Sequence, residues 1–239
     1  MSTSEKKNVN QFNQDVLANE GYLYTTNAKF SSMVANLRLT EATLDKLHSG
    51  IKMVIDVGAG DGTYTAEIKK AKPEISFWGL DPAAGAIETA QRKYPDIKFV
   101  VGNILEKETL PQQKFDLAVV RGVLHHLSNP KLALANVARL ADHAIIIEPN
   151  GWNPVLKLIE RLSTYHREHE EQSFSLSKLK TWCQEAGYRV TSVDYVGFVP
   201  FFFPTLLAKT IYAIQPLLEK IPVIKHLFTA CYVIRCEKK

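Results

Sequence analysis

The chain has 239 residues, of which 46% are hydrophobic and 23% charged, and 29 Lys and Arg against 25 Asp and Glu leave a formal net charge of +4. This composition indicates one globular domain or slightly more, and it excludes an intrinsically disordered, collagen-like or low-complexity chain. The positive charge is too small to indicate a nucleic-acid-binding groove, which needs Lys and Arg clustered on one face. A small-molecule partner is therefore favoured over a nucleic acid.

The cysteines and the first residues bear on the cellular compartment. The chain has three cysteines, which are too few for a framework of disulfide bonds and do not have the spacing of paired metal ligands: Cys183, Cys231 and Cys236. Residues 1–20 carry several charges and no continuous apolar core, so they lack the pattern of a secretory signal peptide. We therefore expect a cytoplasmic protein that holds no metal.

Residues 1–50 are expected to form a helical N-terminal preface, because apolar residues recur at helical spacing there. From residue 51 onward, short apolar runs alternate with helix-like stretches, which is typical of strand-helix-strand units and a mostly parallel sheet. The predicted strands are Met53–Val57, Ser76–Leu80, Lys98–Val101, Asp116–Val120 and Ala144–Ile147. The predicted helices are Thr63–Lys70, Ala83–Lys93 and Lys131–Leu140, the last of them opened by an Asn129 cap and Pro130.

The regular alternation ends at Glu148. Residues from about 149 to 187 are therefore expected to form an insertion on the substrate side of the sheet. The predicted elements in and after this insertion are helices Pro154–Leu162 and Leu176–Ala186 and the strand-like runs Tyr188–Val196 and Leu227–Arg235.

Residues 198–224 are rich in Phe, Leu and Ile, but four prolines and Lys209 interrupt them. These residues prevent a continuous apolar helix of membrane-spanning length, so no transmembrane segment is predicted. Three interpretations stay open for this stretch: an entrance for an apolar, lipid-like substrate, a peripheral contact with a membrane surface, and a cover for the edge of the sheet.

A glycine-rich turn follows the first predicted strand. Gly58, Gly60 and Gly62 lack a Cβ and tolerate positive φ, so a ligand can lie directly against the backbone. Asp81 ends the next strand, where a carboxylate can bind the hydroxyls of a ribose. Because ligands of open parallel sheets bind at the carboxyl ends of the strands, the two features together predict a nucleoside site.

The turn departs from the fingerprint of dinucleotide-binding proteins, because Thr63 stands where that fingerprint has its third glycine. Asp56 and Asp61 also bring negative charge to the turn. This charge opposes a pyrophosphate but suits a sulfonium and an ammonium group. An NAD-dependent oxidoreductase is therefore disfavoured.

Three motifs follow one another between Met53 and Glu148: the glycine turn, the strand end Leu80-Asp81-Pro82, and a segment that ends in Leu124-His125-His126-Leu127. Through these motifs the chain resembles the class I S-adenosylmethionine-dependent methyltransferases. The resemblance implies an α/β fold with a Rossmann-like, mostly parallel sheet of seven strands, an antiparallel last strand and helices on both faces. It also implies S-adenosyl-L-methionine as cofactor.

The resemblance further implies which residues hold the cofactor. Asn103 stands where relatives often have an aspartate, but its amide can still accept from the adenine amino group and donate to a ring nitrogen. Arg121 stands where relatives more often have a small residue, so only its backbone is assigned to the cofactor. The implied cofactor-binding residues are Asp56, Gly58, Ala59 and Gly60 at the methionine end, Asp81 at the ribose, Pro82, Asn103 and Ile104 around adenine, and Arg121.

Methyl transfer to oxygen or nitrogen also requires that a proton leaves the acceptor. His125, His126 and Glu148 lie after predicted strands, and each is a candidate general base, with His125 favoured. The alternative is a structural role, in which these side chains bond to backbone groups of the turns. Candidates for the acceptor pocket are Tyr24 in the preface, which would act as a lid, and Asn150, Trp152 and His166 in the insertion.

These residues favour a methyltransferase that acts on a small molecule, with oxygen preferred as acceptor and nitrogen next. The acceptor would belong to secondary-metabolite, saccharide or lipid biosynthesis. The alternative left open is a non-catalytic nucleoside-binding protein whose insertion holds a partner.

Overall fold

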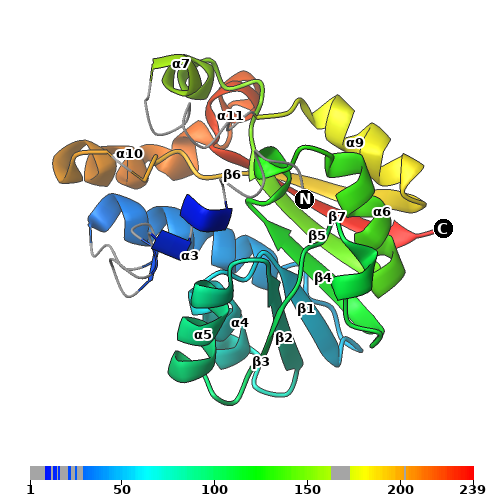
Figure 1. The fold of residues 1–239 in the computed structure, drawn as a ribbon. Coiled ribbons are helices and arrows are strands. Elements are labelled where there is room, and N and C mark those ends of the chain that lie inside the picture. Colours follow the sequence, from blue (N-terminus) through cyan, green and yellow to red (C-terminus); the bar gives the residue numbers. More distant parts are fainter. Residues whose placement is uncertain are drawn as a thin grey trace.

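The structure is a computed structural model, and it describes residues 9–11, 13–14, 16, 21–22, 25, 29–162, 173–201 and 203–239. Its described residues form one seven-stranded sheet with helices packed on both faces (Figure 1). The predicted α/β class and seven-stranded, Rossmann-like arrangement are confirmed.

The strand order in the sheet is β3-β2-β1-β4-β5-β7-β6. Strands β1 to β5 run parallel to one another, whereas β7 runs antiparallel to both β5 and β6. The first strand therefore lies in the middle, with β2 and β4 on its two sides. The bounds are β1 Met53–Val57, β2 Ser76–Asp81, β3 Lys98–Val101, β4 Phe115–Arg121, β5 Ala141–Pro149, β6 Tyr188–Val196 and β7 Cys231–Lys238.

Alternate residues of the central strands enter two different cores, as expected for strands buried on both faces. Ala144 and Ile146 of β5 pack with α6 (Pro130–Leu140) and α9 (Leu176–Glu185). Their neighbours Ile145 and Ile147 pack on the other face with α3 (Phe30–Leu44), α4 (Thr63–Ala71) and α5 (Ala84–Lys93). Two 3-10 turns, η1 (Lys107–Thr109) and η2 (Leu124–His126), follow β3 and β4.

The cap predicted for α6 is present. The Asn129 side chain accepts a hydrogen bond of 3.1 Å from the Leu132 N–H, and Pro130 occupies the first turn. Proline is favourable at that position because the first N–H groups of a helix have no intrahelical acceptor.

The strand predicted at Leu227–Arg235 is wrong in its bounds. Residues Pro222–Phe228 form a helix, α11, and the strand β7 begins only at Cys231 and continues to Lys238. Pro222 lies in the first turn of α11, where its fixed φ suits a helix. The strand extends beyond the predicted end because β5 and β6 offer hydrogen-bonding edges on both sides as far as Glu237.

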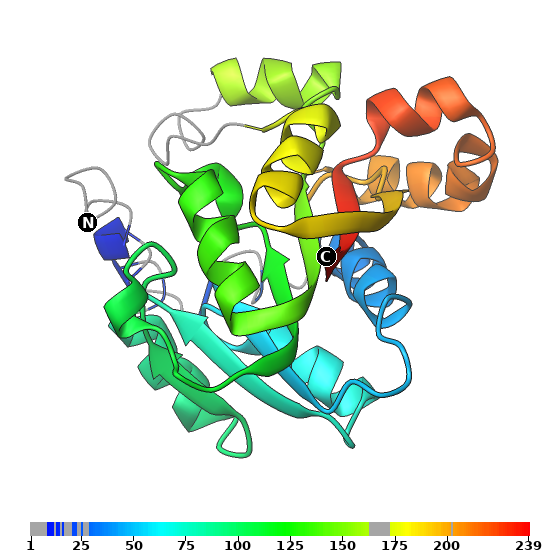
Figure 2. The ribbon, with the colours of Figure 1, turned by 90° about the vertical axis from the view of Figure 1, so that its right-hand side faces the viewer.

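Three helices lie beyond the central α/β units: α7 (Pro154–Leu162), α10 (Thr205–Leu218) and α11. They cluster near the end of β5, where α10 and α11 project to one side of the sheet (Figure 2). Across the described ranges, no helix combines the length and apolarity that crossing a bilayer requires.

Candidate active site

The turn after β1 adopts left-handed backbone conformations that require glycine. Gly58 has φ +81° and Gly60 has φ +55°. A Cβ at Gly58 would collide with the Val123 side chain, and a Cβ at Gly60 would collide with the Tyr22 ring. At both positions glycine is needed, because the backbone has positive φ and because a neighbouring side chain leaves no space for a Cβ.

Asp81 joins this turn to the end of β2. Its Oδ2 accepts the Gly60 N–H at 3.0 Å, and its Oδ1 accepts the Ala83 N–H at 2.8 Å. The N–H groups of Gly58 and Ala59 donate to the Leu80 carbonyl at 2.7 and 3.1 Å. The structure thus brings the glycine turn and the acidic strand end together, as the sequence predicted.

The chemistry of Asp81 fits a ligand with neighbouring hydroxyl groups. The residue is buried, and burial raises the pKa of its carboxyl from 3.8 to about 6. Each carboxylate oxygen accepts one N–H and has capacity for a second donor. Hydroxyl donors from a ribose would stabilise the ionised form and reverse part of the pKa shift. The donor set therefore fits the sugar of S-adenosylmethionine.

Asp56 and Asp61 lie on the two sides of the turn. Asp56 accepts a 2.6 Å hydrogen bond from the Thr65 hydroxyl, and burial raises its pKa to about 6. Asp61 accepts the Tyr22 N–H at 3.2 Å and the Thr25 hydroxyl at 2.7 Å. Described residues of the preface therefore lie directly over the turn, with the Tyr22 ring against Gly60.

The predicted adenine-side residues follow β3. Asn103 Oδ1 accepts the Leu105 N–H at 3.0 Å, which fixes the orientation of the amide. The Ile104 carbonyl accepts the Asn136 amide at 2.7 Å, so α6 holds this loop in place. Both Asn103 and Ile104 are buried, whereas Pro82 after β2 is half-buried.

Arg121 lies at the end of β4, and its side chain is directed to α3. Its guanidinium carbon lies 3.6 Å from the centroid of the Tyr64 ring, and its nitrogens donate to Thr40 Oγ1 and Asn36 Oδ1 at 3.2 Å each. The Tyr64 hydroxyl also donates to Asn36 Oδ1. The sequence assigned no target to this side chain, and the structure places it in a network between α3, α4 and β4.

His125 and Glu148 form a buried pair at the ends of β4 and β5. His125 Nδ1 lies 2.9 Å from Glu148 Oε2. Glu148 Oε1 accepts the Val123 and Leu124 N–H groups at 3.0 and 2.8 Å. Glu148 is completely buried and His125 is nearly so, which places the pair beneath the surface at the carboxyl ends of the two strands. The His126 ring lies beside that of His125, with centroids 4.0 Å apart.

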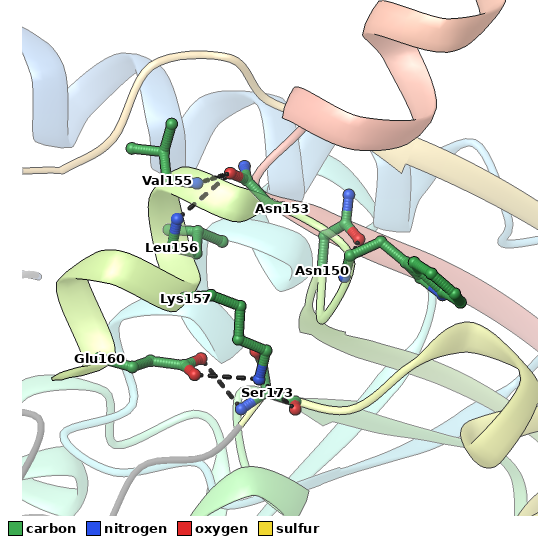
Figure 3. A network of polar contacts seen from close by, with 8 residues as sticks. Asn150, Asn153, Val155, Leu156, Lys157, Glu160 and Ser173 are labelled. Atoms are coloured by element: carbon green, nitrogen blue, oxygen red, sulfur yellow. Dashed lines mark hydrogen bonds and ion pairs between the residues drawn. The ribbon is translucent and has the colours of Figure 1, made fainter.

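The insertion begins with two asparagines whose amides bind the backbone of other segments. Asn150 Nδ2 donates to the carbonyls of His226 and Thr229 at 2.9 and 3.1 Å, and its Oδ1 accepts the Trp152 N–H at 3.0 Å. Asn153 Oδ1 accepts the N–H groups of Val155 and Leu156, which caps α7 (Figure 3). Of the predicted acceptor residues, Asn150 is thus buried in the link to α11, Trp152 is exposed, and Tyr24 and His166 lie outside the described residues.

Replacing Asn150 by alanine is expected to lower the free energy of unfolding. The change leaves the buried Thr229 carbonyl and the more exposed His226 carbonyl without this donor, and the loss at the buried carbonyl costs on the order of 1 to 3 kcal/mol. Urea unfolding followed by circular dichroism measures this effect. Unchanged stability together with a raised KM for the acceptor would instead assign Asn150 to the acceptor pocket.

Several contacts of this region were not predicted from the sequence. Tyr22 and Thr25 reach Asp61 across 39 and 36 residues, and Arg121 reaches Asn36 across 85. No local spacing signals such contacts, because they depend on where α3 and the preface pack. In the described part of the chain, no three His, Cys, Asp or Glu side chains are grouped to hold a metal ion.

Comparisons with known proteins agree with this geometry. The family model described as "Methyltransferase domain" matches residues 55–143, which contain the glycine turn, Asp81 and the His125-His126 segment. An uncharacterized methyltransferase of Mycobacterium bovis is 30% identical over 93 residues, which are 38% of this chain and 46% of that protein. The matched region thus spans less than half of that relative.

Solved structures share the fold over a longer stretch. A SAM-dependent methyltransferase of Thermotoga maritima, described as a possible histamine N-methyltransferase, superposes with TM-score 0.64 and 17% identity over 97% of this chain and 96% of that one. An O-methyltransferase from neocarzinostatin biosynthesis, solved with S-adenosylmethionine and 2-hydroxy-5-methyl naphthoic acid, superposes with TM-score 0.60 and 17% identity over 87% of this chain and 55% of that one. At such identities the likeness shows the fold alone.

Proposed function

Because the chain belongs to the class I S-adenosylmethionine-dependent methyltransferases, we propose that it transfers a methyl group to a small-molecule acceptor in the cytoplasm. The observation that carries this proposal is the bond between the Gly60 N–H and Asp81 Oδ2. This bond joins a glycine turn to a buried carboxylate at the carboxyl ends of two neighbouring strands, the position where open parallel sheets bind ligands.

The cofactor would be held by groups that the fold already orients. Asp81 would accept the ribose hydroxyls, Asn103 and Ile104 would line the adenine, and the backbone from Gly58 to Gly60 would line the methionine end, with Asp56 nearby. S-adenosylmethionine supplies a methyl group on a sulfonium, so the protein mainly has to place the acceptor in line with it.

The proton of the acceptor would pass to His125. Glu148 Oε2 accepts from Nδ1, which makes Nε2 the basic nitrogen of the neutral imidazole. An acceptor hydroxyl or amine at Nε2 would lose its proton to that nitrogen while its oxygen or nitrogen bonds to the methyl carbon and the bond from that carbon to sulfur breaks, with S-adenosylhomocysteine as the leaving group. Glu148 would act as a positioning residue, because it is completely buried and already accepts two backbone N–H groups.

The preface and the insertion would complete the acceptor side of the site. Tyr22 and Thr25 tie the preface to Asp61, so residues 1–50 would act as a lid that excludes water during transfer. The described residues 149–162 of the insertion lie after Glu148 and would supply the opposite wall, with Trp152 at its surface, whereas α9 packs on the sheet. An oxygen acceptor is preferred and a nitrogen acceptor is next, and one structural neighbour of each kind is described.

Two measurements test the proposal. Calorimetric titration of the folded protein with S-adenosylmethionine and S-adenosylhomocysteine should give saturable binding, and no detectable heat would overturn the assignment of the site. Incubation with radiolabelled S-adenosylmethionine and panels of hydroxylated or amino-bearing metabolites should then label an acceptor. Binding without turnover on any acceptor would favour a non-catalytic nucleoside-binding protein instead.

The affinity for S-adenosylhomocysteine is expected to fall as the pH is lowered through about 6. The ribose hydroxyls need an ionised Asp81, whose pKa in the free protein is raised to about 6 by burial. Below that pH, protonation reduces affinity by up to about tenfold per pH unit. Titration calorimetry over a series of pH values measures the slope, and Asp81→Asn should make it shallower.

Protonation of Asp81 does not itself destabilise the fold at low pH. The folded-state pKa of Asp81 lies above its value of 3.8 in a model peptide, so this carboxyl lowers the free energy of unfolding as the pH rises from about 4 to 6, not as it falls. An affinity that stays constant across this range would show that Asp81 does not bind the ligand as a carboxylate.

A further inference from the structure

The outward side of α10 carries several exposed apolar side chains, with Thr210 as the polar residue among them. Ala208 and Gln215, seven residues apart, are buried on the side that packs against α3. On the opposite side lie Leu206, which is 81% exposed, and Leu217, which is 63% exposed. Leu207 and Ile214 lie beside them and are also exposed, and no charged residue of α10 falls within this stripe. Interfacial helices have this pattern.

Exposed apolar side chains are also present at the start of the next helix. Ile221 and Val223 at the start of α11 are exposed, the latter by 65%. We call Leu206, Leu207, Ile214, Leu217, Ile221 and Val223 the α10–α11 surface. Large exposed apolar side chains that gather on neighbouring helices often mark an interaction site. Both helices project from the sheet, with α10 resting on α3 (Figures 1 and 2).

The charges around this surface are positive. Between residues 198 and 230 the sequence has Lys209, Lys220 and Lys225 and a single acid, Glu219. Glu219 lies 3.1 Å from Arg38 of α3, which also pairs with Glu41, so this acid is held on the α3 side of α10. Lys209 and Lys220 are exposed. Lysines at the border of an apolar helix face attract anionic lipid headgroups while their stems lie along the apolar surface.

We propose that the α10–α11 surface docks on a membrane that contains anionic phospholipids, with its apolar side chains in the headgroup–acyl boundary and its lysines at the phosphates. A second copy of the chain fits this surface less well, because two such faces would place lysines opposite lysines. No spanning helix is needed, since interfacial binding uses only one face of each helix.

Docking of this kind would bring the membrane close to the candidate active site. Asn150, two residues after Glu148, donates to the carbonyls of His226 and Thr229 at the end of α11. The α11 helix is thereby fixed to the carboxyl end of β5. Exposed Trp152 lies beside this link, and indole rings favour the membrane interface.

Vesicle sedimentation of the full chain tests the proposal. At low salt the protein should sediment with vesicles of phosphatidylcholine mixed with phosphatidylglycerol, and much less with pure phosphatidylcholine. The double variant Leu206→Glu, Leu217→Glu should lose binding, because both side chains are exposed and their charges would enter the boundary. The matched control Leu132→Glu changes an exposed leucine of α6 and should bind as the parent protein does.

Charge reversal separates lipid docking from other uses of the surface. Lys209→Glu, Lys220→Glu should weaken binding to anionic vesicles at least tenfold, because each lysine near the surface contributes about 1 kcal/mol. Lys52→Glu, Lys70→Glu makes the same change of net charge on exposed lysines elsewhere and should have little effect. Failure of the folded protein to sediment with anionic vesicles at low salt overturns the proposal. So does a dimer in light scattering that dissociates in the leucine variant, since the surface would then bind a second copy.

Discussion

Replacing Asp81 by alanine is expected to weaken the binding of S-adenosylhomocysteine about tenfold to 100-fold. The ionised carboxylate would accept hydrogen bonds from both ribose hydroxyls. Losing hydrogen bonds to a charged acceptor costs on the order of 1 to 3 kcal/mol. The substitution also removes the acceptor of the Gly60 and Ala83 N–H groups, which hold the turn against β2. Titration calorimetry at a pH above 7 gives the affinity with Asp81 ionised.

Asp116 offers a matched control for this prediction. Its Oδ2 accepts the N–H groups of Lys52 and Met53 at 2.7 and 2.8 Å, so it also ties two neighbouring strands together through two backbone donors. It is the second residue of β4 and lies near the amino ends of the strands, whereas Asp81 lies at the carboxyl end of β2. Asp116→Ala should therefore lower stability without changing affinity. Equal effects of the two substitutions on affinity would remove Asp81 from the ligand site and leave it only a structural role.

Replacing His125 by alanine is expected to lower kcat about 100-fold to 10,000-fold while the affinity for S-adenosylhomocysteine stays the same. This is the usual range for the loss of a general base. The imidazole is oriented by Glu148 Oε2 at 2.9 Å, and the cofactor is held by residues of other loops. Single-turnover transfer of radiolabelled methyl to the acceptor identified by screening measures the chemical step.

Two comparisons make the His125 prediction specific. His143 lies near the start of β5, away from the carboxyl ends of the strands, and His143→Ala should leave kcat unchanged. An acceptor analogue whose hydroxyl is already ionised needs no base, so it should lose much less rate in the His125 variant. A full rate for His125→Ala with a neutral hydroxyl acceptor would contradict proton transfer to this residue and leave the pair with Glu148 a structural role.

Most strands and helices of the central fold could be predicted from short stretches of the sequence. The strands Met53–Val57 and Lys98–Val101 and the helix Pro154–Leu162 lie where the sequence predicts them, because apolar runs, glycines and prolines act over a few neighbouring residues. The end of the chain was predicted less well. The apolar residues at the end of Pro222–Phe228 suggested the start of a strand, but the structure has a helix there. The strand β7 starts later, where its residues pair with β5 and β6.

The candidate site divides in the same way. The sequence by itself determined the glycine turn, the acidic strand end and their order, since these require particular residue types at short spacing. Only the tertiary structure decided that His125 pairs with Glu148, that Arg121 turns to α3, that Asn150 binds α11, and that Tyr22 covers Gly60. Those contacts join residues far apart in the chain, and their partners are selected by how the helices pack on the sheet, which no local pattern encodes.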